Sequence, residues 1–305
     1  MRYLKVVLLV LLLECFIFLP FVQSARAEED ILSIGSISVE PKEEAAKYQS
    51  FVDYLASHLE EAGINKGECV VAGSMNEMAN LIKKGEVDIF IDSPFPTIRV
   101  CRFSGAKPFL RRWKKGVKEY SSIIFVRRDS NIDTIEDLKG KIVAFEESFS
   151  TSSYFLPKAT LMKEGLTLTE KKDFFSSVSS NEIGYVFSGD DETTMVWVLR
   201  EKVSGGALHS TEFEQLAKDG ISELKILTET INVPRQVVSH RADLNPELLA
   251  AIEKVLLNMD KDEDGKKVLK GFEKTAKFDK FDKGAEETLR PIENLVDFIE
   301  KDLSD

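Results

Sequence analysis

The sequence predicts an α/β protein built from two lobes. Strand-like and helix-like segments alternate from residue 31 to residue 93, and the same alternation starts again near residue 122. Such alternation indicates parallel sheets whose strands are joined by right-handed helical crossovers. From residue 232 the chain adds one more strand and further helices, which we assign to the first lobe.

The first lobe is expected to begin with a strand at residues 31–38, where apolar and small polar residues alternate. A helix over residues 43–61 follows, because its apolar residues recur at helical spacing. The segments CVVAG at residues 69–73 and VDIFIDS at residues 87–93 predict two further strands, with a helix at residues 76–85 between them.

The second lobe is predicted to open with a strand at residues 120–130, followed by a short helix at residues 134–140. KIVAFEE at residues 141–147 predicts the next strand, and a helix runs from Ser150 to Gly165, where glycine ends it. The rest of this lobe is predicted as one helix and two strands, at residues 192–202, 205–208 and 224–230.

The returning chain is predicted to form a strand at residues 235–241 and a helix at residues 246–259. Residues 260–273 begin like a calcium-binding loop, but Gly271 stands where such a loop needs a bidentate glutamate. We therefore expect a solvated turn there. Three aromatic residues are expected to pack the tail on the first lobe: Phe272, Phe278 and Phe281.

Residues 1–27 have the pattern of a secretory signal, with Arg2 and Lys5 before an apolar stretch and an AxA-type site ending at Ala27. We expect cleavage after Ala27 and export to the periplasm. Removal of these 27 of the 305 residues leaves 278, enough for two lobes of ordinary size. The predicted lobes comprise residues 28–121 with 232–305, and residues 122–231.

The formal net charge of the chain is −11, and the signal removes three basic residues and one acidic residue, so the mature chain carries −13. This charge argues against nucleic acid and anionic membrane surfaces as partners. It does not exclude a small anion, because a closed site binds through local dipoles. We expect a monomer.

Cysteine and histidine usage bears on redox chemistry and catalysis. Cys69 and Cys101 remain after cleavage, and they form either a disulfide or two buried thiols. His58, His209 and His240 are scattered, and no sequence typical of a hydrolase, metalloprotease, dinucleotide site or phosphate-binding loop occurs. We therefore predict no enzymatic activity, no metal site and no cofactor.

The turn after the strand at residues 141–147 carries three consecutive hydroxyl residues, Ser150, Thr151 and Ser152. They occupy the first turn of a predicted helix, where unpaired N–H groups and the positive end of the helix dipole attract anions. A single hydroxyl is enough to cap a helix. The two additional hydroxyl residues favour an oxyanion-binding turn over a simple helix cap.

The segment STSSYFLP resembles the serine-threonine-serine signature at the phosphonate pocket of PhnD-like periplasmic phosphonate-binding proteins. IGSISVEP, VDIFIDSPF and INVPRQVVSHRADLNPELL are similar to segments of that family in the same order, so the resemblance spans about residues 31 to 275. It implies a type II periplasmic-binding-protein clamshell, with two α/β lobes joined by two crossing strands. It also implies capture of a phosphonate, phosphate or related oxyanion for an ABC permease.

By this resemblance, the hydroxyls of Ser150, Thr151 and Ser152 would bind the phosphonyl oxygens. The resemblance implies three further ligand-facing positions: Tyr120 on the hinge strand, Ser38 after the first strand, and the acidic residue Glu192.

The chain departs from the family pattern at several positions. Asp92 and Ser93 stand where the family commonly has an aromatic residue, Met75 where a tyrosine is common, and Asp191 where histidine is common. A frequent aspartate corresponds to Ser204. These departures imply an altered pocket.

The acidic residues Asp92, Asp191 and Glu192 suit an amino group on a zwitterionic ligand such as an aminoalkylphosphonate. For Glu192 the alternative is a favourable carboxylate in the first turn of a helix, and Asp190 is expected to be a helix cap.

Two alternative functions remain open, and the altered positions motivate the first of them. One is a periplasmic sensing protein that keeps the fold and signals ligand occupancy to a membrane receptor. The weaker alternative is a receptor for a sulfonate or a thiamine precursor on the same fold.

Overall fold

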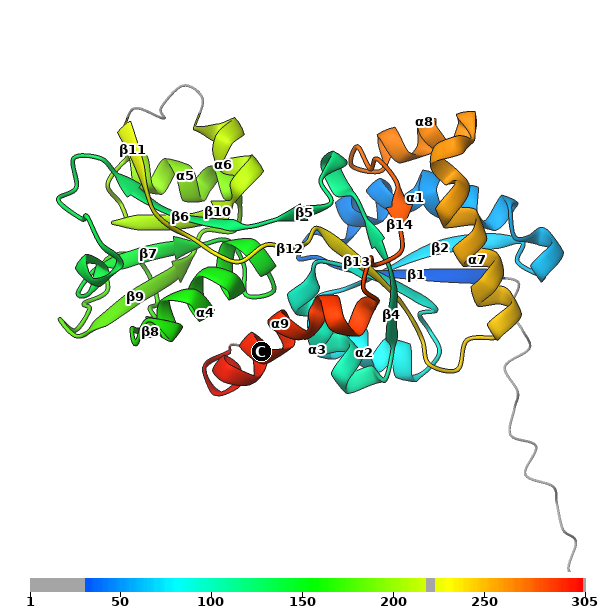
Figure 1. Cartoon of the computed structure of the whole chain (residues 1–305), viewed down its shortest axis with the longest axis horizontal. Helices are drawn as coiled ribbons and strands as arrows, with labels where there is room; N and C mark the ends of the chain where they lie inside the picture. The colour runs from blue at the N-terminus through cyan, green and yellow to red at the C-terminus, as the bar shows by residue number, and fades with distance from the viewer. Residues whose placement is uncertain (1–30, 218–222, 304–305) are drawn as a thin grey trace, which may run out of the picture.

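The computed structural model describes residues 31–217 and 223–303. Figure 1 shows two α/β lobes joined by a narrow two-stranded ribbon. The predicted signal and its cleavage site lie outside the described residues. Within the described ranges, no helix combines the length and the apolar character that a membrane span requires.

The first lobe contains a six-stranded sheet in the order β14-β4-β13-β3-β1-β2. Its strands are β1 (Ile31–Ile37), β2 (Lys66–Ala72), β3 (Ile89–Asp92), β4 (Lys107–Arg112), β13 (Gln236–His240) and β14 (Phe278–Asp279). β1 is parallel to β2 and β3, whereas β13 is antiparallel to both of its neighbours, β3 and β4. The strand that returns from the second lobe is therefore inserted in the middle of this sheet.

Helices cover both faces of the first sheet. α1 (Pro41–Ser57), α7 (Pro246–Asn258) and α8 (Glu263–Gly271) share one core with Leu32 and Ile34. α2 (Met75–Lys83) and α3 (Pro94–Ser104) contribute to the core on the other face. The alternation of side chains along β1 thus supplies both layers.

The aromatic residues of the tail pack on the first lobe as predicted. Phe272 stacks on Phe51 with ring centroids 4.3 Å apart, and Phe278 stacks on the same ring at 5.7 Å. Phe281 is buried in the core that also contains α3. A turn between helices is present as predicted, but it is limited to residues 259–262, because Asp262 accepts a hydrogen bond from the Gly265 N–H and caps α8.

Cys69 and Cys101 are both free thiols. Cys69 lies in β2 beside the core of α1, and Cys101 lies in α3 beside the core of the opposite face. The sheet therefore separates them, and the disulfide alternative does not hold.

The second lobe contains a six-stranded sheet in the order β11-β6-β10-β7-β9-β8. Its strands are β6 (Ser122–Arg127), β7 (Ile142–Phe145), β8 (Thr167–Glu170), β9 (Glu182–Phe187), β10 (Gly205–His209) and β11 (Leu224–Glu229). The main helices are α4 (Leu156–Lys163), α5 (Asp191–Leu199) and α6 (Ser210–Leu216). As in the first sheet, an antiparallel strand, β6, lies next to parallel strands.

Two short antiparallel strands connect the lobes, β5 (Glu119–Tyr120) and β12 (Val233–Pro234). Tyr120 pairs with Val233, and the Arg235 N–H donates to the Lys118 carbonyl at 2.9 Å. The α/β clamshell with two crossing strands is therefore confirmed.

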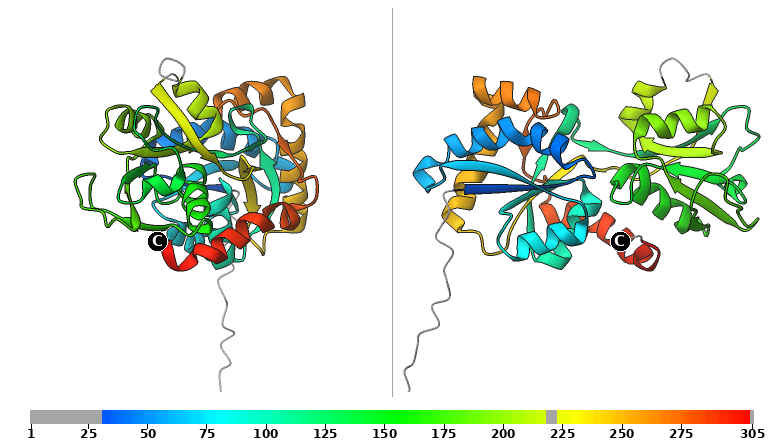
Figure 2. Two further views of the ribbon diagram at one scale, coloured as in Figure 1. Left: turned by 60° about the vertical axis from the view of Figure 1, so that its left-hand side comes forward. Right: turned by 180° about the vertical axis from the view of Figure 1, so that it is seen from behind.

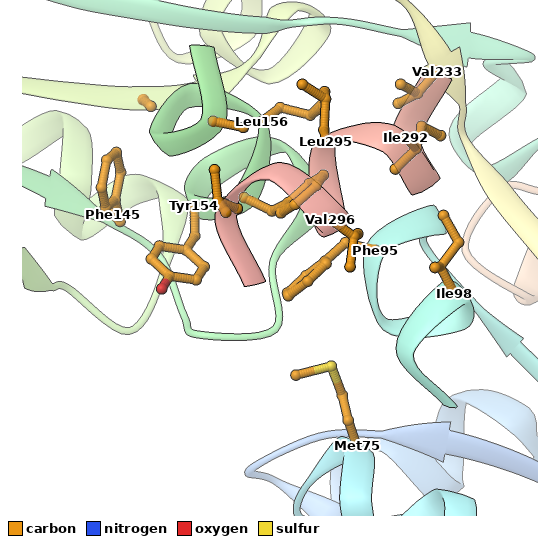
Figure 3. Packing of buried hydrophobic residues seen from close by; sticks show 14 of the residues in the cluster. Met75, Phe95, Ile98, Phe145, Tyr154, Leu156, Val233, Ile292, Leu295 and Val296 are labelled. Carbon is orange, nitrogen blue, oxygen red and sulfur yellow. The ribbon is translucent and has the colours of Figure 1, made fainter. Parts of the chain in front are cut away.

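The last helix, α9 (Ala285–Ile299), contacts both lobes, although its residues were assigned to the first lobe. It packs on α3 and β4 of the first lobe and on α4 of the second, as the views in Figures 1 and 2 show. Figure 3 shows Leu295 and Val296 of α9 in one core with Phe95 of α3 and Leu156 of α4. At its end, the Asp302 carbonyl accepts a hydrogen bond from the buried Lys158.

Candidate ligand-binding site

A cavity of about 460 Å³ lies between the lobes, and we call it the inter-lobe cavity. Segments of the first lobe, of the second lobe and of the hinge all contribute to its walls. A wider groove of about 780 Å³ runs along α1 and α7 on the first lobe, but none of the predicted site residues lines it. The inter-lobe cavity is therefore the candidate site.

The structure brings most of the predicted site residues together at the inter-lobe cavity. Eight of them line it: Ser38, Asp92, Ser93, Tyr120, Ser150, Thr151, Ser152 and Asp191. Glu192 does not line it; this exposed residue faces a neighbouring shallow hollow with Val196 and Trp197. Asp191 lines both this hollow and the inter-lobe cavity, whereas Glu192, about 100° further round the helix, lines the hollow alone.

We call Ser150–Ser152 the hydroxyl turn. It leads into a π-helix, Thr151–Phe155, that continues directly into α4. Ser150 caps it, because its side-chain oxygen accepts a hydrogen bond from the Ser153 N–H at 3.0 Å. Pro157 has no N–H to donate to the Ser153 carbonyl, which accepts from the Glu146 N–H instead. The Phe155 N–H reaches back five residues to the Ser150 carbonyl, and this widens the turn at the cavity.

Thr151 connects the two lobes. Its hydroxyl oxygen accepts a hydrogen bond from the Phe95 N–H at 2.9 Å, and its O–H donates to the Ser93 hydroxyl at 2.8 Å. Ser93 in turn donates through its N–H and O–H to the Asp92 carboxylate. In this arrangement the O–H of Thr151 is committed to the other lobe.

Asp191 is fixed against the turn, because the Ser153 hydroxyl donates to its carboxylate at 3.0 Å. The neighbouring Asp190 accepts from the Thr193 N–H at 2.6 Å and caps α5, as predicted. Ser153 is a residue that the sequence pattern did not single out, although it belongs to the same run of hydroxyl residues.

The sequence pattern also did not indicate the basic side chains and the histidine of the site. Lys114, His209 and Arg235 line the inter-lobe cavity from the end of β4, the end of β10 and the hinge. The Lys114 ammonium pairs with the Glu273 carboxylate at 2.7 Å. Burial acts to raise the pKa of Glu273, but Lys114 and Arg112 hold it at about 2.

Residues 34 to 286 match a family model described as the periplasmic substrate-binding protein of a phosphonate ABC transporter. The chain belongs to this phosphonate-binding family. The match confirms the predicted family and covers most of the chain, including every element that lines the inter-lobe cavity. This member of the family is accordingly a periplasmic substrate-binding protein.

Relatives and solved structures agree with the family. The phosphate-import protein PhnD of Mycolicibacterium smegmatis is 24% identical over 238 residues, which are 74% of this chain and 72% of the relative. XAC2383 from Xanthomonas citri, solved bound to ATP, has a TM-score of 0.82 at 24% identity and covers 91% of this chain and 100% of its own. PhnD1 from Prochlorococcus marinus, solved with methylphosphonate, has a TM-score of 0.66 at 17% identity, covering 89% and 99%. The two structures show the fold.

The cavity of this phosphonate-binding family member holds more acidic than basic side chains. Eight acidic residues line it against three basic ones: Glu40, Glu44, Asp92, Glu146, Glu147, Asp190, Asp191 and Glu273 against Lys47, Lys114 and Arg235. Burial raises the pKa of Asp92, of Glu147 and of Asp191 to about 7 each. These carboxylates therefore titrate near neutral pH.

This titration predicts that the ligand-free protein becomes more stable as the pH falls from 7.5 toward 5. An unfolded carboxyl has a pKa near ~4, so between about 4 and 7 the folded form binds protons that the unfolded form has released. His209 acts in the opposite direction, because burial and nearby positive charge lower its pKa to about 3 against about 6.5 when unfolded. Burial also lowers the pKa of His240, which acts in the same direction as His209. The two histidines do not outweigh the three carboxylates.

The measurement is the melting temperature of residues 28–305 at pH values between 5 and 7.5, without ligand. The doubly substituted variant Asp92→Asn with Asp191→Asn is expected to have a weaker pH dependence than the wild type. A melting temperature that stays constant or falls between pH 7.5 and 6 would contradict the raised pKa values.

Proposed function

We propose that this protein captures a phosphonate, phosphate or related oxyanion in the inter-lobe cavity and delivers it to an ABC permease. The observation that carries the proposal is the hydroxyl turn Ser150–Ser152, which opens into a cavity enclosed by both lobes and the hinge. Hydroxyl and backbone N–H donors at the start of a helix bind the oxygens of a tetrahedral anion.

The three hydroxyls of the turn have different parts in this proposal. Ser152 donates to the ligand. The Ser150 oxygen caps the turn with a lone pair, and its O–H is shared with the neighbouring Glu146 carboxylate. Tyr120 is buried beside Thr151 and Ser152 and supplies a phenolic O–H at the hinge. Thr151 joins the lobes around the bound anion and does not itself donate to it.

The carboxylates that line the inter-lobe cavity support a ligand that carries a positive group in addition to its oxyanion. Asp92 and Asp191 line the cavity near the turn, and an ammonium group between them would compensate their charge. The cavity volume is within the range of small-molecule sites and exceeds the space that a bare phosphate fills. An aminoalkylphosphonate, or an amine-bearing phosphate ester of similar size, has both the positive group and the volume that the cavity suits.

The test is a thermal-shift screen of residues 28–305 with phosphate, phosphite, methylphosphonate, aminoethylphosphonate, ATP, thiamine monophosphate and alkylsulfonates. A ligand at about 100 times its Kd stabilises the folded protein by about 2.7 kcal/mol. The phosphoryl compounds are expected to stabilise the wild type and to lose this effect in Ser152→Ala. Ser148→Ala is the matched control, since Ser148 lies in the same segment but does not line the cavity.

The outcomes separate the alternatives. A shift with alkylsulfonates alone would favour the sulfonate receptor, and a shift with thiamine monophosphate alone would favour the thiamine-precursor receptor. No shift with any compound would overturn oxyanion capture. Normal uptake of the bound compound by cells that lack the gene would favour the sensing function over delivery to a permease.

A further inference from the structure

The inter-lobe cavity contains one basic side chain without a carboxylate partner. Lys47 pairs with Glu44 at 3.2 Å, and Lys114 pairs with Glu273 at 2.7 Å. Within residues 31–217 and 223–303, Arg235 makes no ion pair, and its buried Nε–H has no hydrogen-bond acceptor. The guanidinium is therefore the cation of the cavity that has no direct ion-pair partner in the described part of the chain.

His209 presents a second buried donor at the same place. Its Nδ1 accepts a hydrogen bond from the Glu212 N–H, so the ring proton is on Nε2. In the described part of the chain this Nε2 has no hydrogen-bond partner, and the nearest carboxylate oxygen, of Glu212, is 3.6 Å away. Only 4% of His209 and 9% of Arg235 is exposed, so bulk water does not satisfy either group.

Both groups pack against the ring of Tyr120. The Arg235 guanidinium carbon is 4.8 Å from the ring centroid, and the His209 ring meets it edge-on with centroids 5.5 Å apart. Stacking fixes the direction of the guanidinium fork before any ligand arrives. A buried N–H without an acceptor is costly, and two such groups beside one aromatic ring indicate a missing partner.

We propose that Arg235 and His209 bind one phosphoryl group beside Tyr120, and that they select doubly charged phosphonates and phosphate monoesters over singly charged sulfonates. This inference rests on the proposed oxyanion capture. Arg235 supplies a full positive charge and a planar fork that matches two oxygens of the group. His209 supplies a neutral donor, because its pKa of about 3 keeps it unprotonated above that pH.

A water molecule is the alternative partner for these N–H groups. Water satisfies one donor, but it does not give the Arg235 guanidinium an ion-pair partner. Burial raises the pKa of Glu146 and of Asp191, and nearby Arg235 only partly opposes this; neither carboxylate reaches ion-pair distance from Arg235. An anionic ligand is the partner that supplies both the acceptors and the charge.

The position of Arg235 also connects binding to the hinge. Its backbone N–H donates to the Lys118 carbonyl on the opposite hinge strand, and Tyr120 belongs to that same strand. A ligand held by Arg235 and Tyr120 therefore contacts both crossing strands. This arrangement favours one angle between the lobes when the ligand is bound.

The test is calorimetric titration of residues 28–305 with methylphosphonate, phosphate, ATP and methanesulfonate. The variants are Arg235→Met, Arg235→Lys and His209→Asn, where asparagine retains the cap of α6 and loses the ε-nitrogen. Arg290→Met removes the same charge from an exposed position of α9 and serves as the control.

We expect Arg235→Met to weaken phosphoryl binding by more than about tenfold, the loss typical of a charge-assisted hydrogen bond. Methanesulfonate should bind weakly to the wild type, and the preference for phosphoryl groups should shrink in Arg235→Met. Arg235→Lys should restore part of the affinity. The melting temperature without ligand should change little, which distinguishes this result from misfolding.

Wild-type binding that Arg235→Met and His209→Asn leave unchanged would overturn this inference while the proposed function stands. Aminoethylphosphonate is titrated as well; if the wild type binds none of these compounds, the proposed function fails and this inference fails with it.

Discussion

Replacing Arg112 by methionine is expected to lower the free energy of unfolding by about 3–5 kcal/mol, as for other broken buried ion pairs. Arg112 is fully buried, and its guanidinium lies 3.5 Å from the centroid of the Phe272 ring. It donates to four acceptors: the side chains of Thr275, Gln236 and Glu273 and the carbonyl of Phe272. Methionine fills similar space but leaves these acceptors without their donor.

The measurement is urea unfolding of the ligand-free protein followed by circular dichroism. Arg112→Lys should retain part of the stability, because an ammonium keeps the charge near Glu273 but cannot reach all four acceptors. Lys118→Met is the control, since its bridge to the exposed Asp282 is worth at most about 1 kcal/mol. Equal losses of unfolding free energy in Arg112→Met and Lys118→Met would show that the buried hydrogen bonds of Arg112 stabilise the fold no more than a surface ion pair does.

Replacing Phe155 by alanine is expected to cost about 3–5 kcal/mol and to weaken the contact between the lobes. The Phe155 ring stacks on Phe95 of the other lobe, with centroids 4.4 Å apart and planes 2° apart, and both rings are fully buried. Alanine leaves an unfilled space where α3 meets the hydroxyl turn, so we expect that turn to be held less firmly.

Phe175→Ala is the matched control, because 85% of Phe175 is exposed and its loss should change stability by no more than about 0.5 kcal/mol. Urea unfolding compares the two variants, and small-angle X-ray scattering of the ligand-free proteins reports the separation of the lobes. An unchanged scattering profile with unchanged stability in Phe155→Ala would mean that the stacked rings do not hold the lobes together.

The regular parts of the fold could be predicted because their sequence patterns are local. β1, α2 and β3 have clear periodicity and were placed within a few residues. β4 was missed because its alternation is hidden: KPFLRR ends in Arg111 and Arg112, which are buried through ion pairs and not through apolar character. α3 was missed because its first turn contains Pro94 and Pro96, which resemble a loop in the sequence.

The candidate site was predictable only where one segment carries several of its residues. The hydroxyl turn is such a segment, and its neighbours Asp92 and Ser93 follow a recognisable strand. Arg235 and His209 stand alone in the sequence, and only the hinge and the end of β10 bring them to Tyr120. No local pattern distinguishes such residues from ordinary surface arginines and helix caps.

The hydrogen bonds of Thr151 give the hydroxyl turn two tasks that depend on each other. The Thr151 hydroxyl bonds to Ser93 and Phe95 of the other lobe, so it takes part in the equilibrium between separated and joined lobes. The flanking hydroxyls of Ser150 and Ser152 face the cavity and take part in the equilibrium between free and bound ligand. Because one short segment carries both, any change that favours the joined lobes also raises ligand affinity, and the ligand favours joined lobes by the same factor.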